Sequence, residues 1–431
     1  MKLKQYLSTV QWFMFLVANS IAIPVVVGTL FHLPVDDIAS LIQRTCLVVG
    51  LSSFLQGWLG HRLPIADGPA GSWVSVFVVL ADLASRQGQS VQETLQLLSG
   101  AVLLAGVLLA VLGLCKAIHR LAFLFTPLVT GTFLLMLALQ LCGVFMKGMF
   151  GLTGGAAEPD YAVTALAMGI FLLVLVLSLL AKGWVKQYAV LIGLLAGWLL
   201  YEVLGMRPGG IASATGGAWL QPPDVFAWGL PLVNVSIVIT VVLFTFLLIS
   251  NTVAAISAVE DATGASPDGR SQRLNRAGIM GGVSHMLASV FSTIGVVPLP
   301  VSAGFIRMTE QRSVRPFLAA GLLFTAVSFL PAAVHGLALL PGPIASAALL
   351  TTFVQMIGIA MRSITSVPLD ERRMSILGIS LACGMGLMAL PGVAIQGLPV
   401  PLQYILGNGL LFGTMTVIVL ERVWKPRSIR L

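Results

Sequence analysis

Apolar runs of membrane-spanning length recur from one end of the chain to the other. Of the 431 residues, 57% are hydrophobic and only 9% are charged. Soluble domains carry roughly 25% charged residues, so this chain has too few charges to cover a water-facing surface. About 20 apolar residues suffice to cross the hydrocarbon core of a bilayer as a helix. The sequence therefore predicts a polytopic membrane protein, and it excludes a soluble enzyme or a nucleic-acid binder.

Polar residues, glycines and prolines divide the chain into fourteen expected spans joined by short connections. These spans are 8–30, 38–60, 64–82, 94–115, 121–146, 161–181, 187–205, 231–259, 276–294, 298–309, 314–334, 339–361, 374–395 and 402–420. Because the connections are short, we expect no large extramembrane domain.

The positions of lysine and arginine test this count. With an even number of spans and both termini in the cytoplasm, 20 of the 24 basic residues lie on the cytoplasmic side. Cytoplasmic loops of membrane proteins are enriched in these residues, and a missed span would reverse every later loop. Topology thus explains the net charge of +8 without a nucleic-acid partner. We expect a multi-pass protein of the cytoplasmic membrane.

The chemistry-bearing residues give no sign of an enzyme. The four cysteines lie in separate apolar runs, the five histidines are scattered, and no HExxH or GxSxG motif occurs. A membrane enzyme would need a nucleophile with its base, or a set of metal ligands. We therefore expect no catalytic residues, no metal and no cofactor.

Two expected spans, the third and the tenth, are interrupted by prolines, glycines and small hydroxyl residues. The third reads LPIADGPAGSWV from Leu63, and the tenth reads VVPLPVSAGFIRMT from Val296. Broken backbone at membrane depth is tolerated only where it is buried in protein or lines a cavity. Each break is third in its half of seven spans, and two halves with an odd number of spans lie in opposite orientations. Such paired breaks mark the binding site of many transporters, although two ordinary proline kinks are the alternative.

Short motifs elsewhere complete a pattern that covers essentially the whole chain. They are Gln11 with Pro24, Phe125-Thr126-Pro127, Gly304 with Thr309, and the stretch GLPVPLQ at 397–403. In their order and spacing the chain resembles the nucleobase–ascorbate transporter family, which contains bacterial uracil, xanthine and urate permeases. Within it, the chain is most similar to a branch named for purines.

The resemblance implies an all-α membrane protein built as a 7+7 inverted repeat, with spans three and ten each broken into a short strand plus a half-helix. Residues 1–116 (spans 1–4) and 230–336 (spans 8–11) would form a core domain. Residues 117–229 (spans 5–7) and 337–431 (spans 12–14) would form a gate domain. The core would slide against the gate in an elevator-type motion, coupled to a proton or to sodium, and a homodimer would be possible.

The chain departs from the family at its substrate contacts. In the tenth span Gly304 and Thr309 match the family signature, but Val301 and Ser302 replace the acid or amide and the asparagine that precede them. In the eighth span, where the family usually has a glutamate, this chain has Ile249-Ser-Asn-Thr252, with Ala254 at the place of a histidine.

We expect the substrate between spans three, eight and ten, held partly by backbone N–H groups of 70–72 and 301–303 at half-helix ends. Ser250 and Asn251 of the eighth span either face the substrate or pack helices together, and a carboxamide suits the edge of a base because it donates and accepts. The candidate substrate-binding residues are Asp67, Gly68, Ala70, Gly71, Ser72, Ser250, Asn251, Pro300, Val301, Ser302 and Ala303.

Asp67 is the candidate for proton coupling. A charged aspartate at membrane depth costs roughly 2.5–3.5 kcal/mol, and Asp67 is the only acidic residue near the expected site. The alternatives are that it caps the following half-helix or pairs with Arg62. His285 is either a proton relay or a neutral histidine bonded to a neighbouring helix.

The leading functional hypothesis is a secondary transporter of a nucleobase, with a purine favoured, driven by proton symport. An anion exchanger of the sulfate or bicarbonate type and an uncoupled nucleobase facilitator are the alternatives. The sequence leaves open which base is carried, in which direction, and with which coupling ion.

Overall fold

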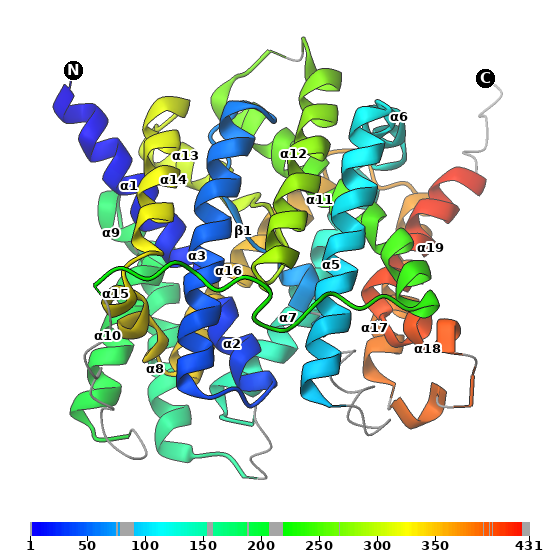
Figure 1. Cartoon of the computed structure of the whole chain (residues 1–431). Coiled ribbons are helices and arrows are strands. Elements are labelled where there is room, and N and C mark those ends of the chain that lie inside the picture. Colours follow the sequence, from blue (N-terminus) through cyan, green and yellow to red (C-terminus); the bar gives the residue numbers. More distant parts are fainter. Residues whose placement is uncertain are drawn as a thin grey trace.

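The two interrupted segments meet near the middle of a helical bundle, where they form a two-stranded sheet (Figure 1). The structure is a computed structural model. It describes residues 2–74, 76–77, 90–152, 158–187, 189–206, 219–266, 268–390, 392–395, 397–398 and 400–424.

The first half of the chain contains helices of very different lengths. They are α1 (Lys2–Ser20), α2 (Ala22–Leu30), α3 (Val35–Trp58), α5 (Val91–Leu114), α6 (Ala117–Leu121), α7 (Pro127–Met149), α8 (Tyr161–Leu180), α9 (Gly183–Gln187) and α10 (Ala189–Val203), with strand β1 (Asp67–Pro69) and the 3₁₀ turn η1 (Ala122–Leu124).

The second half repeats this mixture. Its elements are α11 (Val235–Thr263), α12 (Arg270–Val290), β2 (Val296–Pro298), α13 (Val301–Thr309), α14 (Val314–Val327), α15 (Pro331–Ala338), α16 (Gly342–Ile364), α17 (Glu371–Ala389), η2 (Gly392–Ile395), α18 (Val400–Gly407) and α19 (Gly409–Val423).

Local sequence signals explain where several helices begin and end. Thr126 caps α7 by accepting a hydrogen bond from the N–H of Val129 at 3.3 Å, and Pro127 occupies the first turn, where its missing N–H is not needed. Asn234 caps α11 in the same way. This helix ends at Gly264, whose φ of +70° is a left-handed conformation that favours glycine.

Seven helical stretches of the described residues are long and apolar enough to cross a membrane. They are Gln5–Leu30, Val35–Trp58, Val91–Leu114, Pro127–Met149, Tyr161–Leu180, Phe244–Thr263 and Gly342–Ile364. Other expected spans lie on helices that are short, broken or charged. Span 314–334, for example, is divided into α14 and α15, and α12 begins with three arginines in two turns. The chain is thus a multi-pass helical membrane protein, and the count of fourteen stays a prediction.

Strands β1 and β2 pair antiparallel, with Gly68 opposite Val297 at the centre. The N–H of Ala70 donates to the carbonyl of Gly295 at 2.9 Å, and the N–H of Leu299 donates to the carbonyl of Ala66 at 2.8 Å. All six strand residues are buried. Helix α13 follows β2, and residues 71–74 after β1 are helical. Each interrupted segment is therefore a short strand followed by a helix. The end of the expected span 64–82 lies outside the described residues.

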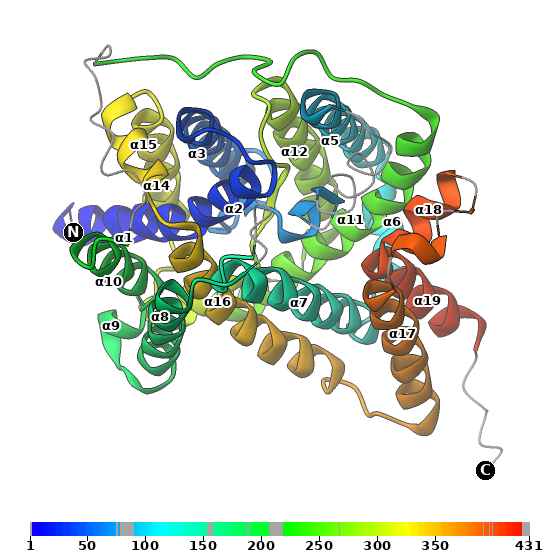
Figure 2. The same cartoon turned by 90° about the horizontal axis from the view of Figure 1, so that it is seen from below.

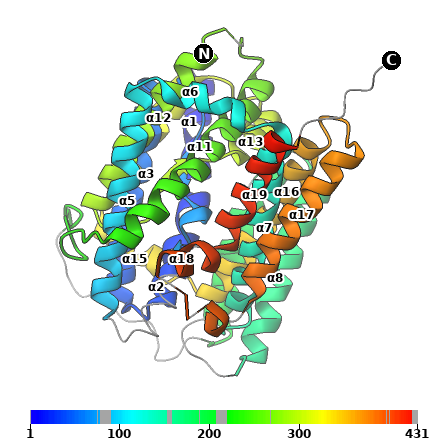
Figure 3. The same ribbon diagram turned by 90° about the vertical axis from the view of Figure 1, so that its right-hand side faces the viewer.

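Seen from below, the helices form two rows (Figure 2). One row contains α14, α3, α12 and α5, in which α3 packs on α14 and α12 packs on α5. The other contains α8, α16, α7, α17 and α19, in which α7 packs on α16. The side view separates the same two groups, with α11 between them (Figure 3). The strand pair lies inside the bundle and all six of its residues are buried, as broken backbone at membrane depth requires.

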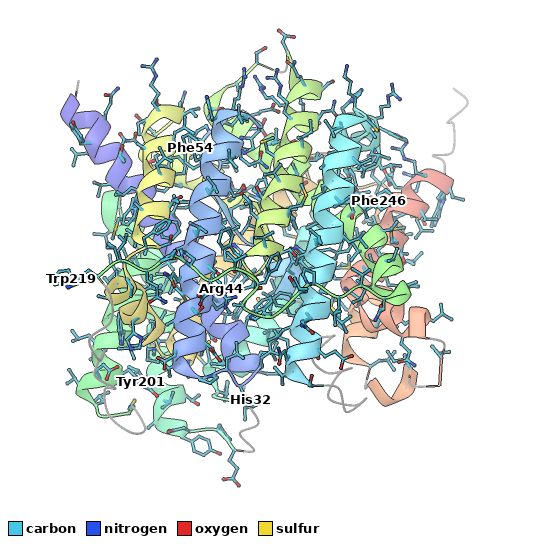
Figure 4. The ribbon with its side chains drawn as sticks, viewed as in Figure 1. His32, Arg44, Phe54, Tyr201, Trp219 and Phe246 are labelled. Atoms are coloured by element: carbon cyan, nitrogen blue, oxygen red, sulfur yellow. The ribbon has the colours of Figure 1, made fainter. Side chains whose placement is uncertain are left out.

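An extended stretch, residues 219–234, crosses the outside of α3, α12 and α5 before α11 begins (Figure 1). Arg44 of α3 lies beneath it (Figure 4) and donates to the carbonyl of Ser292 at 2.7 Å. The guanidinium carbon of Arg44 is 5.6 Å from the centre of the Trp228 ring. Trp228 lies in this stretch, and its backbone N–H donates to Ser292 Oγ at 3.2 Å. These contacts attach the connection between the two halves to the row that contains α3.

Candidate functional site

Asp67, the first residue of β1, points its carboxyl group at α3. The residue is 1% exposed, and its Oδ2 is hydrogen-bonded to Ser52 Oγ. Its backbone N–H donates to Ser53 Oγ at 3.0 Å. The other carboxyl oxygen, Oδ1, is buried and has no hydrogen-bond partner within the described part of the chain. A buried carboxyl oxygen without a hydrogen-bond partner raises the free energy of the folded protein, so Asp67 is held in this position at a cost in stability.

Neither structural alternative for Asp67 describes its contacts. Arg62 is exposed, and among the residues that the structure describes no ion pair joins it to Asp67. The Asp67 carboxyl group bonds back to α3, and it accepts no hydrogen bond from the described residues of the helix that follows β1.

Helix α12 adds a third hydroxyl group to this region. Ser284 Oγ lies 2.6 Å from Ser52 Oγ and donates to the carbonyl of Met280 at 2.9 Å. Ser52 and Ser284 are both fully buried. Sequence reasoning did not select Ser52, Ser53 or Ser284. The available signal was a pair of adjacent hydroxyl residues in the middle of an apolar span, which alone does not distinguish a site from helix packing.

Next to this hydroxyl cluster, Trp73 Nε1 donates to His285 Nε2 at 3.1 Å. A tryptophan N–H can only donate, so Nε2 accepts, and the ring proton lies on Nδ1, 2.8 Å from the carbonyl of Gly281. Both residues are buried. His285 is therefore a neutral histidine bonded to a neighbouring segment, as one of the two sequence interpretations expected. A Cβ at Gly295 would lie 2.2 Å from Trp73 Nε1, so only glycine fits beside this ring.

On the β2 side, Asn251 of α11 donates from Nδ2 to the carbonyl of Pro298 at 2.9 Å. Half of its carboxamide thus joins a helix to a strand, which is the packing role that the sequence left open. Ser250, the residue before it, is fully buried, and its Oγ has no partner in the described residues. Of the two, Ser250 has the group that still needs a polar partner.

Several backbone N–H groups that we expected to meet a ligand are already used. Ala70 donates to Gly295, while the N–H groups of Ser302 and Ala303 donate to the carbonyls of Leu299 and Pro300, each at 3.1 Å. For these three residues the expectation was wrong, because their N–H groups already form hydrogen bonds within the strand pair or within the first turn of α13. Pro300 has no N–H at all.

Side-chain contacts fix the remaining predicted residues in the same frame. Ser302 Oγ accepts a hydrogen bond from the N–H of Ala66 at 3.1 Å, which ties the start of α13 to the residue before β1. Ser72 is 4% exposed. A Cβ on Gly68 would lie 2.6 Å from Leu299, and one on Gly71 would lie 2.5 Å from Leu141 of α7. Gly71 is thus where the first half-helix touches the second row of helices.

The structure therefore brings the predicted residues together from both interrupted segments and from α11. No group of three or more histidine, cysteine, aspartate or glutamate side chains that could hold a metal ion occurs among the described residues.

Comparison with known proteins decides the family. The sequence model of the Permease family (Xan_ur_permease) matches residues 3–393. The chain belongs to this family. Its members are transporters and not enzymes, so a small-molecule substrate and a membrane setting follow for this chain.

Curated relatives of this permease cover nearly its whole length. It is 35% identical to a Bacillus subtilis (strain 168) protein named "Putative purine permease YwdJ", over 99% of this chain and 98% of that protein. It is 22% identical to the uric acid permease PucJ of the same organism, over 99% and 93%. The xanthine permease XanP of Escherichia coli (strain K12) is 24% identical, over 92% and 86%.

Solved structures with the same fold come from more distant transporters. The transmembrane domain of the cyanobacterial bicarbonate transporter BicA matches with a TM-score of 0.65 and 12% identity, over 96% of both chains. SLC26A9 matches with a TM-score of 0.63 and 15% identity, over 97% of this chain and 66% of that one. At these identities the likeness concerns the fold alone.

Proposed function

We propose that this permease is a secondary active transporter that moves a nucleobase of the purine class across the cytoplasmic membrane. One observation carries the proposal: two broken segments, β1 and β2, meet at the centre of the bundle beside a buried carboxyl group. Broken segments at corresponding positions are typical of transporter binding sites. The names of the relatives, which refer to purines, uric acid and xanthine, support the choice of substrate.

In this proposal the base lies between α11, α13 and the half-helix after β1. A purine edge alternates hydrogen-bond donors and acceptors, so it needs a protein group of each kind. Ser250 offers a buried hydroxyl without a partner. Gly71 and Val301 begin the two half-helices, where the helix dipole is positive. The other candidates, which shape the site, are Gly68, Ala70, Ser72, Asn251, Pro300, Ser302 and Ala303.

We further propose that Asp67 carries the coupling proton. Its burial and its unpartnered Oδ1 support this role, because an isolated carboxylate in a low-dielectric interior is costly and a neutral acid is not. Sodium is the alternative coupling ion.

The transport motion that we propose is a sliding of the core (1–116 and 230–336) against the gate (117–229 and 337–431). The packing pattern supports two inverted halves of seven spans. The pair α3–α14 corresponds to the pair α12–α5, and α8–α10 corresponds to α17–α19, as an inverted repeat requires. Cytoplasmic termini and a homodimer belong to the same proposal, the first on the distribution of basic residues and the second on the family resemblance.

The test is competition for uptake into proteoliposomes at two external pH values. Radiolabelled xanthine is the probe, and unlabelled uric acid, hypoxanthine, adenine, uracil, sulfate and bicarbonate are the competitors. We expect purines to compete, and accumulation to be greater with an acidic exterior. Competition by sulfate or bicarbonate alone would support the anion exchanger, which the relatives do not favour. Saturable purine uptake without accumulation at either pH would identify an uncoupled facilitator.

A further inference from the structure

A chain of three short oxygen-to-oxygen contacts leads from Asp67 into the interface of α3 and α12. Asp67 Oδ2 contacts Ser52 Oγ, Ser52 Oγ lies 2.6 Å from Ser284 Oγ, and Ser284 Oγ lies 2.9 Å from the carbonyl oxygen of Met280. Strand β1 is therefore hydrogen-bonded to α12 through two serine hydroxyl groups.

Each of the three contacts needs one proton between its two oxygen atoms to be a hydrogen bond. Each serine hydroxyl donates one proton, and a carbonyl oxygen only accepts. The hydroxyl proton of Ser284 is used in the hydrogen bond to Met280, so the contact between the serines uses the hydroxyl proton of Ser52. The remaining contact, between Ser52 and Asp67, is a hydrogen bond only if the carboxyl group of Asp67 itself carries a proton. With an ionised Asp67, one of the three contacts would have no proton.

Among the described residues, no charged side chain forms an ion pair with Asp67 that would favour its ionised form. Strand β1 packs against α1, α3 and β2, and β2 in turn packs against α11 and α12. The titratable groups of these helices with described side chains are Tyr6, Asp36, Asp37, Arg44, Cys46, Glu260, Asp261, Arg270, Arg273, Arg276 and His285. Within the described residues none of them bonds to Asp67. His285, the nearest in sequence to Ser284, has both ring nitrogens engaged.

The same interface continues with polar groups toward the end of α3. One turn beyond Ser52, Gln56 donates from Nε2 to the carbonyl of Ala277 on α12 at 3.1 Å, while its buried Oε1 has no partner among the described residues. His61 is fully buried and accepts at Nδ1 from the N–H of Leu63, so its Nε2 carries a proton that is also unpartnered there. The next residue, Arg62, is exposed.

We propose that Ser52 and Ser284 relay the proton of Asp67 into the α3–α12 interface, and that it leaves past Gln56 and His61 at the end of α3. This inference rests on the proposed function, in which Asp67 carries the coupling proton. The route lies on the α3 and α12 side of the strand pair, whereas Asn251 bonds to β2 from α11. The proton and the substrate would then use different faces of the same strand pair.

The proton balance of the relay is simple. Asp67 gives its proton to Ser52 Oγ, Ser52 gives its own to Ser284 Oγ, and Ser284 turns its hydroxyl group away from the carbonyl of Met280 and gives its own proton to a water molecule in the interface. Each serine gains and loses one proton, and the water leaves as hydronium. Four residues of an α-helix rise about 6 Å, a gap that one water spans between Ser52 and Gln56. Gln56 Oε1 and His61 Nε2–H serve as its hydrogen-bonding partners.

The experiment compares net uptake with substrate exchange in proteoliposomes, using radiolabelled xanthine. Net uptake requires the proton to leave after each cycle, whereas exchange of labelled for unlabelled xanthine does not. We expect Ser52→Ala and Ser284→Ala to slow net uptake by about tenfold and to leave exchange unchanged. Ser52→Thr, which retains the hydroxyl group, should restore net uptake.

The matched control is a second pair of buried hydroxyl groups, which joins α12 to α5 instead of α3. Ser99 of α5 and Ser289 of α12 have their Oγ atoms 3.1 Å apart, and both are fully buried. Ser99→Ala and Ser289→Ala remove a comparable interhelical contact away from Asp67, and both activities should be retained. If Ser52→Ala does not fold, Gln56→Leu tests the same route and should also slow net uptake alone.

The outcomes separate this inference from the proposed function. Unchanged net uptake in Ser52→Ala and Gln56→Leu would overturn the relay, and so would an equal loss of net uptake and exchange. If Asp67→Asn nevertheless abolishes pH-dependent accumulation, the proposed function stands without the relay. If Asp67→Asn keeps pH-dependent accumulation, Asp67 does not carry the coupling proton, and if no purine is transported, the proposed function itself fails.

Discussion

The two interrupted segments have the same backbone but different chemistry. In each, a three-residue strand ends in a proline, Pro69 or Pro298, and a helix follows. The flanking hydrogen bonds are equivalent, at 2.9 and 2.8 Å. With Gly68 opposite Val297, the position that corresponds to Asp67 in the second segment is Val296.

Only the first segment therefore carries an ionisable group. Asp67 contacts Ser52, whereas Val296 is an apolar residue that is 1% exposed. The backbone is the same in both segments, but only the first carries a charge. We therefore expect a division of roles, in which the first segment couples the ion and the strand of the second segment is purely structural. The following predictions test this division, beginning with the largest expected effect.

Asp67→Asn should abolish concentrative, pH-dependent uptake. Asparagine has nearly the same shape and can still hydrogen-bond to Ser52, but it cannot release a proton. Uptake of labelled xanthine at two external pH values measures the effect, and exchange of labelled for unlabelled xanthine checks that the site still binds. Concentrative uptake that still depends on pH in this variant would assign Asp67 a structural role.

Val296→Asp should destabilise the protein by roughly 2.5–3.5 kcal/mol, because the new acid is buried without a designed hydroxyl partner. The melting temperature of the purified protein in detergent measures it, and Val296→Thr, which has a similar shape and no charge, is the control. A variant as stable as the original protein would mean that the second segment accommodates a charge as well as the first. The two segments would then differ in sequence but not in how well they accommodate a buried charge.

Gly295→Ala should destabilise the strand pair by about 1–3 kcal/mol through overpacking. A Cβ at Gly295 would lie 2.2 Å from Trp73 Nε1, and the ring is fixed by its bond to His285. The matched control is Gly304→Ala in α13, where a Cβ would meet nothing within 4 Å. The melting temperatures of the Gly295→Ala and Gly304→Ala variants measure this difference in stability. Equal values would show that Trp73 moves freely and does not fix the geometry of the second segment.

The sequence predicted these breaks well, because proline and glycine act on the backbone of their own segment. It did not predict which way Asp67 points, because that depends on the register between distant helices. Ser52 and Ser284 are 232 residues apart in sequence and meet only through the packing of α3 on α12. Nor did it predict that Ala70, Ser302 and Ala303 would use their N–H groups internally, since pairing of the strands decides that.

Asn251→Ala should weaken both the fold and substrate affinity, by about 1–3 kcal/mol in total. The variant leaves the carbonyl of Pro298 without its donor at 2.9 Å, so the second strand loses its bond to α11. Melting temperature and xanthine affinity, measured together, divide the effect. A loss of stability with unchanged affinity would assign Asn251 to packing alone and leave Ser250 as the polar contact from α11.

Ser250→Ala should have the smallest effect on the fold and is therefore the cleanest test of contact with substrate. The hydroxyl group of Ser250 is fully buried and has no partner in the described residues. Removing an unsatisfied buried hydroxyl removes a desolvation cost, so stability should be unchanged or slightly higher. If the hydroxyl bonds to the base, xanthine affinity should fall by about tenfold, which corresponds to about 1.4 kcal/mol. Binding to the purified protein and its melting temperature measure the two effects separately. Lower affinity at unchanged stability would place the base against α11, on the side of the strand pair away from Ser52. If affinity does not change, the base does not contact Ser250. The proposal that substrate and proton use different faces of the strand pair would then have no support on the α11 face.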